Sequence, residues 1–240
     1  MKLLPRIDNT TRTQSKAIEL HNSHKQIMAS TADSLQCAQD ESQRKELHKD
    51  WGGTNWQVTS TLIDHGKKQI IHHYGSKVTK QKVIQLKSIP VCSPTYLNDL
   101  LGRDEGFAFV RAIADKPRAT KEQLVRTFEK ASGKDASDIR FWISSTTNGV
   151  RGVRLCFCGF GRFIVDGYDW LGDFGFSRGV KSLVPSAKQT RVLTYKAIFN
   201  TNSRKIELSA KVQRKLRKDL ERTKLNGKRI PISFTYKEVK

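Results

Sequence analysis

Apolar residues in the first part of the chain recur among polar ones without the alternation that a strand requires. Between residues 12 and 50 they include Ile18 and Leu35, in a spacing that favours helix. The sequence WGGTNW at 51–56 interrupts this pattern with two adjacent glycines, which commonly break regular structure. We therefore expect a helical N-terminal region over residues 1–56.

β-branched residues become more frequent from Gln57 onward. The segments KQIIHHYG and KVTKQKVIQLKSI have the composition of two strands that meet at Gly75 and Ser76. We expect a small, basic, β-rich segment over 57–95. Its cations are Lys67, Lys68, Lys77, Lys80, Lys82 and Lys87.

The clearest helix signal is the sequence ATKEQLVRTFEKASG. Thr120 and Gln123 have the spacing of a capping box, and Gly133 suits the position just past the helix end. Leu124, Val125 and Phe128 supply one apolar face. A preceding helix is expected over roughly 96–114.

The pattern then changes to strands. DIRFWISST and VRGVRLCFCGFGRFIV flank an Asn-Gly pair at 148–149, the turn sequence that most favours a tight hairpin. Two further strands, at 191–199 and 228–239, enclose a very basic helix at about 209–225. The expected fold class is α+β: a helical N-terminal part followed by a mixed, mainly antiparallel sheet with a basic C-terminal helix.

Charge is the strongest feature of the composition. The 240 residues carry a formal net charge of +21 with a pI near 10.0, and such an excess is typical of proteins whose partner is a polyanion. The charge is uneven: 188–240 holds sixteen Lys and Arg against four Asp and Glu, whereas 99–136 is nearly balanced. We expect 96–240 to be an α+β nucleic-acid-binding domain.

The basic helix has a narrow apolar stripe formed by Leu208, Val212, Leu216 and Leu220. A stripe this thin would dock the helix on a sheet and leave its cations outside. The candidate nucleic-acid-binding residues are these cations and four upstream ones: Arg154, Arg162, Arg178, Lys181, Arg204, Lys205, Lys211, Arg214, Lys215, Arg217, Lys218 and Arg222. The alternative is an ordinary solvated basic face.

Two cysteines and three aspartates in one stretch raise the question of a metal. Cys156 and Cys158 lie one residue apart, which is not the usual zinc spacing, and all six histidines precede them by more than eighty positions. On a strand the two thiols would share one face as small apolar groups. We expect packing there, with no metal site and no cofactor.

The aspartates leave a second function open. Asp166, Asp169 and Asp173 could hold Mg²⁺ for phosphodiester cleavage in a metal-dependent nuclease. The Glu-x-Lys that commonly follows such an aspartate is missing from this loop. Turn formation and local charge balance are the simpler interpretation, so we do not expect an enzyme.

Parts of residues 119–222 resemble the histone-like DNA-bending proteins HU and integration host factor. GFGRF is similar to a strand of that family, TKEQLVRTFEKASG to its first helix and NTNSRKIELSAK to the strand returning from its DNA-embracing arm. The resemblance implies DNA binding with bending. The chain departs from the pattern where the long second helix should follow Gly133, and Thr201 stands where the family has an intercalating proline.

Other features limit the compartment and the partners. No apolar run reaches the ~20 residues that a membrane-spanning helix needs, and MKLLPRIDN does not read as a secretory leader. Four scattered cysteines favour a reducing interior, so we expect a cytoplasmic or nucleoid-associated protein that binds no membrane. A homodimer is left open.

The leading hypothesis is a non-enzymatic nucleic-acid-binding protein. It would act through phosphate contacts, on DNA rather than RNA, as an architectural, packaging or regulatory factor. The alternatives are the nuclease and a basic RNA-binding structural protein of a virus or ribosome.

Overall fold

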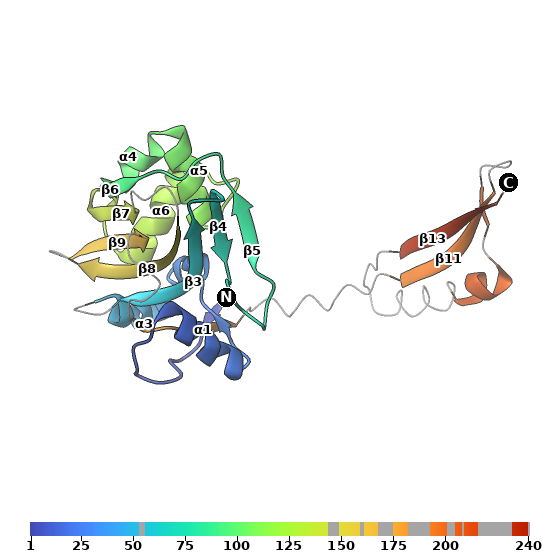
Figure 1. Cartoon of the computed structure of the whole chain (residues 1–240), viewed down its shortest axis with the longest axis horizontal. Coiled ribbons are helices and arrows are strands. Elements are labelled where there is room, and N and C mark those ends of the chain that lie inside the picture. The colour runs from blue at the N-terminus through green and yellow to red at the C-terminus, as the bar shows by residue number, and fades with distance from the viewer. Residues whose placement is uncertain are drawn as a thin grey trace. The chain divides into compact units, whose positions relative to one another are not determined.

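The computed structural model describes residues 1–52, 56–143, 149–158, 161–167, 175–181, 193–200, 205–207, 209–215 and 232–239. It divides the chain into two compact units (Figure 1), which we call unit 1 (Met1–Leu183) and unit 2 (Val184–Lys240). The predicted boundaries after 56 and 95 fall inside unit 1. They do not separate compact units, because strands from 57–85 pair with a strand from 150–158 in one sheet.

Unit 1 is built on a seven-stranded sheet with the order β5-β4-β3-β8-β9-β7-β6. Its strands are β3 (Gln57–Asp64), β4 (Gln69–His72), β5 (Lys82–Gln85), β6 (Cys92–Tyr96), β7 (Ile139–Ile143), β8 (Val150–Cys158) and β9 (Arg162–Gly167). All neighbouring pairs run antiparallel except β7 and β9, which are parallel. The expected α+β class with a mixed, mainly antiparallel sheet is confirmed.

The predicted hairpin around the Asn-Gly pair is wrong. Among the described strands, β7 pairs with β6 and β9, and β8 pairs with β3 and β9. β9 therefore lies between the two strands that were expected to be partners. Asn148 itself lies outside the described residues.

The observed hairpin joins β8 to β9, with Cys158 opposite Arg162. Gly161, expected inside a strand, lies between these two strands. Gly161 has a φ of +76°, a backbone conformation that glycine adopts without strain. Gly161 therefore belongs to the turn between β8 and β9 and not to the interior of a strand.

The N-terminal region is helical but not one long helix. It contains α1 (Gln14–Ser23), α2 (Thr31–Cys37) and α3 (Glu41–Trp51). Ser30 caps α2 in a reciprocal capping box with Asp33, and Asp40 caps α3 through the backbone N–H of Gln43. Two short strands of this region, β1 (Lys2–Leu3) and β2 (Ile27–Met28), enclose β10 (Gly179–Lys181) in a small separate sheet.

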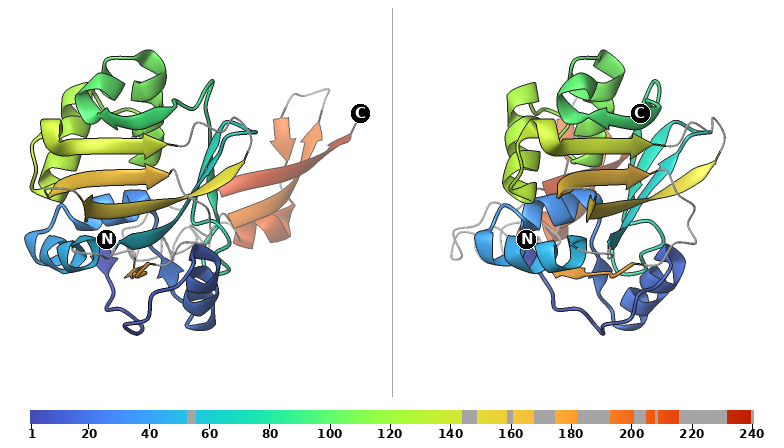
Figure 2. Two further views of the ribbon diagram at one scale, coloured as in Figure 1. Left: turned by 60° about the vertical axis from the view of Figure 1, so that its left-hand side comes forward. Right: turned by 90° about the vertical axis from the view of Figure 1, so that its left-hand side faces the viewer.

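A second group of helices consists of α4 (Leu97–Leu101), α5 (Asp104–Ile113) and α6 (Lys121–Ser132). The predicted capping box of Thr120 and Gln123 is confirmed, and Gly133 ends α6 in the left-handed conformation. Figure 2 shows this group beside the part of the sheet that carries β7 and β9.

The core lies between the helices and one face of the sheet. Phe141 of β7 packs against Phe109 and Phe128, with ring centroids 6.3 and 5.5 Å apart, and Trp51 packs against Phe163 of β9 at 5.0 Å. All five rings are fully buried, and each contributes on the order of 2 kcal/mol of burial free energy.

Unit 2 contains a three-stranded sheet with the order β12-β11-β13. The strands are β11 (Leu193–Asn200), β12 (Lys205–Glu207) and β13 (Ile232–Val239), and the structure describes their backbone. This confirms both predicted late strands. β11 and β13 are parallel, so the chain between them must cross over the sheet, and residues 210–215 of that crossover are helical.

Candidate nucleic-acid interface

The helical residues of unit 2 present exposed cations. Ser209 starts the helix: its carbonyl accepts from the Gln213 N–H at 2.9 Å, and its hydroxyl from the Val212 N–H at 3.4 Å. Lys211, Arg214 and Lys215 are exposed and form no ion pair with a described residue. Their spacing of three and four places them on one side of the helix.

The strands of unit 2 add cationic positions in a regular pattern. Residues paired across a sheet share a face, and faces alternate along each strand. Lys196, Lys205 and Lys237 therefore occupy positions of one face, because Ile198 pairs with Lys237 and Asn200 with Lys205. Glu207, which pairs with Ile198, is the one acidic position among the described pairs of this face. The opposite face carries the more apolar positions, such as Leu193, Tyr195, Phe199, Ile232 and Phe234.

Seven of the twelve predicted contact residues can be placed with their side chains and five cannot. Lys181 is exposed and Arg162 is half-buried. Lys205 lies in β12, for which the backbone is described. The residues outside the described part of the chain are Arg204, Arg217, Lys218 and Arg222.

Arg154 and Arg178 were expected on the phosphate-binding surface, and this expectation is corrected. Each is only 6% exposed. The Arg154 guanidinium donates to Asp166 at 2.7 Å and lies 4.4 Å from the centre of the Trp56 ring. Both arginines hold the interior of unit 1 together instead of facing solvent.

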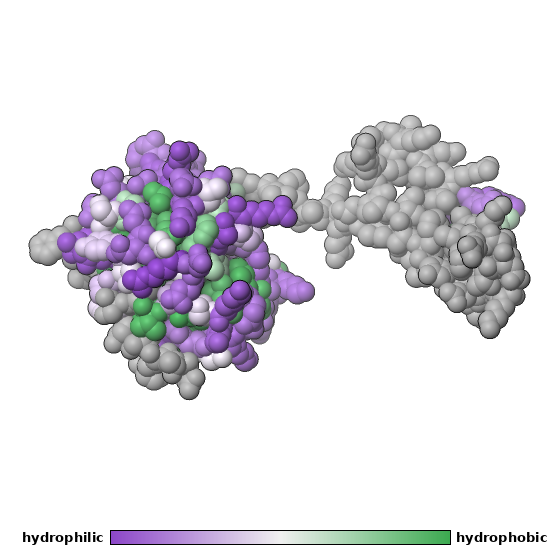
Figure 3. All heavy atoms as spheres, turned by 90° about the horizontal axis from the view of Figure 1, so that it is seen from above, coloured by the Kyte–Doolittle hydropathy of each residue, from purple (hydrophilic) through white to green (hydrophobic). Residues whose placement is uncertain are grey.

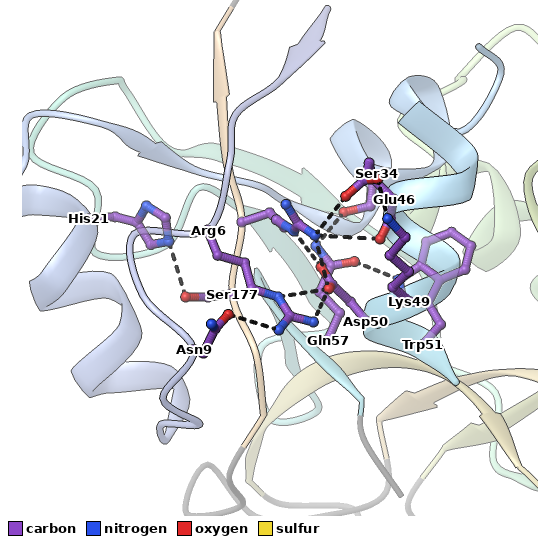
Figure 4. A network of polar contacts seen from close by, with 11 residues as sticks. Arg6, Asn9, His21, Ser34, Glu46, Lys49, Asp50, Trp51, Gln57 and Ser177 are labelled. Carbon is purple, nitrogen blue, oxygen red and sulfur yellow. Dashed lines mark hydrogen bonds and ion pairs between the residues drawn. The ribbon is translucent and has the colours of Figure 1, made fainter. Parts of the chain in front are cut away.

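Arg178 belongs to a buried ion cluster centred on Asp50, whose side chain has no exposed surface. Arg178 Nε donates to Asp50 Oδ2 at 2.5 Å, and Arg6 Nε donates to Asp50 Oδ1 at 2.8 Å. Glu46 Oε2 lies 3.8 Å from Arg178 Nη2. Figure 4 shows Arg6 and Asp50 directed at one another, with His21 beside Ser177.

Of the three candidate nuclease aspartates, only Asp166 is described. It is 8% exposed and engaged by Arg154, so binding a metal would require breaking this ion pair. Asp169 and Asp173 lie outside the described residues. In the described part of the chain, no group of three or more His, Cys, Asp or Glu side chains could hold a metal ion.

The cysteines that the structure places with side chains are Cys37 and Cys156, and both are buried. Burial raises the pKa of the Cys37 thiol to about 12, because the charged thiolate loses its hydration. Such a thiol is inert at neutral pH.

A buried polar network crosses the centre of the sheet without forming a reactive site. Thr61 Oγ1 lies 3.0 Å from His72 Nδ1, and His72 Nε2 lies 2.8 Å from the Ala112 carbonyl oxygen. Burial lowers the pKa of His72. The imidazole is therefore neutral, with both nitrogens engaged, and holds β4 to α5.

Unit 1 has exposed cations of its own that sequence reasoning noted but did not assign to a site. Residues 65–98 contain six lysines and no acidic residue. This segment includes β4 and the edge strand β5. Figure 3 shows hydrophilic residues over much of the described face of unit 1. We call the five exposed lysines without an ion pair to a described residue the edge lysines: Lys67, Lys68, Lys77, Lys80 and Lys87.

Comparisons with known proteins supply no family. No protein-family model, no curated protein and no solved structure matches the chain. Among the described residues, no helix is both long enough and apolar enough to traverse a lipid bilayer. The stretch that resembles the DNA-bending family spans the boundary between the two units, and that resemblance stays a prediction.

Proposed function

We propose that this protein binds nucleic acid, DNA in preference to RNA, through phosphate contacts made by unit 2. It acts as an architectural, packaging or regulatory factor and needs no cofactor for binding. The observation that carries the proposal is the charge of unit 2, which contains sixteen Lys and Arg but only four Asp and Glu. Unit 2 thus holds over half of the net +21.

The proposed contact element is the basic crossover helix, which the structure describes over 210–215 and which the sequence predicts over about 209–225. Lys211, Arg214 and Lys215 support this role because they are exposed, share one side and have no acidic partner among the described residues. Lysine and arginine on one helix face can neutralise successive phosphates, and the released counterions drive association. The lysine positions of the sheet, Lys196, Lys205 and Lys237, enlarge the cationic area of the unit.

Binding of the full chain to labelled duplex DNA, with RNA and single-stranded DNA as competitors, tests the proposal. Changing Lys211, Arg214 and Lys215 together to Ala should weaken binding to all sequences. The slope of log affinity against log salt concentration should become smaller in magnitude by about three.

A matched control changes Lys45 and Lys49 to Ala, because both are already paired with acidic residues of α3, Glu41 and Glu46. The control should bind nearly as well as the wild type. An unchanged slope in the helix variant would remove this helix from the interface, and preferential displacement by RNA would favour the RNA-binding alternative.

A further inference from the structure

The sheet of unit 1 has a second face, opposite the one that packs on Phe109 and Phe128. Along β7 the two faces alternate: Ile139, Phe141 and Ile143 are buried, whereas Trp142 is 37% exposed. Tyr96 of the neighbouring edge strand β6 is also 37% exposed. Tyr96 pairs with Arg140, so it shares the face of Arg140 and Trp142.

Two arginines accompany these rings. The Arg140 guanidinium carbon lies 4.5 Å from the centre of the Tyr96 ring, and Arg140 Nη2 donates to the Tyr96 hydroxyl. Arg140 Nε is buried and has no hydrogen-bond partner among the described residues. Arg162 is half-buried on β9, two positions from Ile164, which is the partner of Arg140.

Next to Trp142 the same face carries Asp166, and this carboxylate is neutralised. Asp166 lies opposite Arg154 in the β8–β9 pair and accepts from it at 2.7 Å. This part of the face therefore combines two partly exposed aromatic rings with two arginines, and the carboxylate paired with Trp142 in the sheet is neutralised. We call Tyr96, Arg140, Trp142 and Arg162 the aromatic face.

We propose that the aromatic face binds single-stranded nucleic acid, with bases stacked on Tyr96 and Trp142 and phosphates held by Arg140 and Arg162. Aromatic rings on a sheet surface stack unpaired bases of any sequence, and arginines beside them follow the backbone. A duplex cannot use these rings, because its bases are already stacked on one another. The inference rests on the proposed function and adds to it a preference for unpaired strands at unit 1.

Affinity of the full chain for a labelled oligonucleotide, single-stranded and as a duplex, tests the inference. Tyr96→Leu and Trp142→Leu should each weaken single-strand binding ~10-fold or more, because stacking on an aromatic ring is lost. Duplex binding should change less than about twofold. The salt slope should stay at the wild-type value, since no cation is removed.

Tyr74→Leu is the matched control, because Tyr74 is 43% exposed in unit 1 away from this face; it should bind both probes as the wild type does. Trp142→Phe keeps a stacking ring and should retain most of the single-strand affinity, which separates stacking from general damage to the fold. Unaltered single-strand affinity in both leucine variants, or equal losses for single strand and duplex, would overturn the inference. An unchanged salt slope after Lys211, Arg214 and Lys215 are changed together to Ala, with the ring effects intact, would overturn the proposed phosphate contacts of unit 2 instead.

Discussion

Arg178 and Asp50 lie 128 positions apart in the chain, and Arg178 Nε donates to Asp50 Oδ2 at 2.5 Å. The bond ties the segment before β10 to the last turn of α3, and Arg6 brings the segment after β1 to the same carboxylate. One buried acid thus joins three distant parts of unit 1. This contact explains why Arg178, which the sequence analysis assigned to the surface, is buried.

Asp50→Asn should lower the free energy of unfolding by about 3–5 kcal/mol, because it leaves two arginines without their buried counter-charge. Urea unfolding of unit 1 in the full chain measures the effect. Glu41→Gln removes the acid of an exposed pair with Lys45 and should cost less than about 1 kcal/mol. Equal losses in the two variants would show that the cluster does not stabilise the fold.

Stability should also fall on mild acidification, partly through His21. Burial lowers the pKa of His21 from 6.5 to about 4, because the charged ring would lose its hydration. The unfolded chain takes up this proton at higher pH than the folded one, so its contribution is complete above pH 6.5 and is lost as pH falls toward 4. The loss is about 3 kcal/mol at full effect.

Chemical unfolding of wild type and His21→Gln at pH 7 and pH 4.5 measures this contribution. The variant should lose less stability between the two pH values than the wild type. It should keep part of the dependence, since burial also lowers the pKa of His48, His65 and His72. Identical pH profiles would contradict the role assigned to His21.

We expect unit 1 to contribute to polyanion binding through the edge lysines. Changing Lys77 and Lys80 to Ala should weaken DNA binding and lower the salt slope by about two, because both are exposed and neither has an acidic partner among the described residues. Titrations at several salt concentrations measure the slope. The paired variant Lys45→Ala and Lys49→Ala removes the same charge from ion-paired positions, and an equal effect there would mean that net charge alone matters.

Local signals carried much of the fold. The capping box of Thr120 and Gln123 and the glycine at 133 lie within fifteen residues of one another, so α6 was predictable with its ends. The division of the N-terminal region into separate helices was also readable, because Ser30 and Asp40 have good capping side chains. The prediction of a helical region over 1–56 does not use these caps.

The pairing of strands that are distant in the sequence could not be predicted from the sequence. An Asn-Gly pair favours a tight turn, yet β7 gains a parallel partner in β9 that arrives twenty residues later, and no local pattern encodes this order. Likewise, nothing beside Arg154 in the sequence indicates that it would be buried against Asp166 and Trp56. Only the pairing of β6 with β7 shows that the exposed rings of Tyr96 and Trp142 lie on the same face of the sheet.

The most direct test is the salt dependence of wild-type binding to duplex DNA. If six to eight cations of the chain meet phosphates, affinity should fall by ~10³-fold or more between 50 and 200 mM salt. A logarithmic plot should then be linear with a slope near −6. Failure to bind at 50 mM, or an affinity that does not respond to salt, would contradict the claim that this cationic chain works by neutralising a polyphosphate.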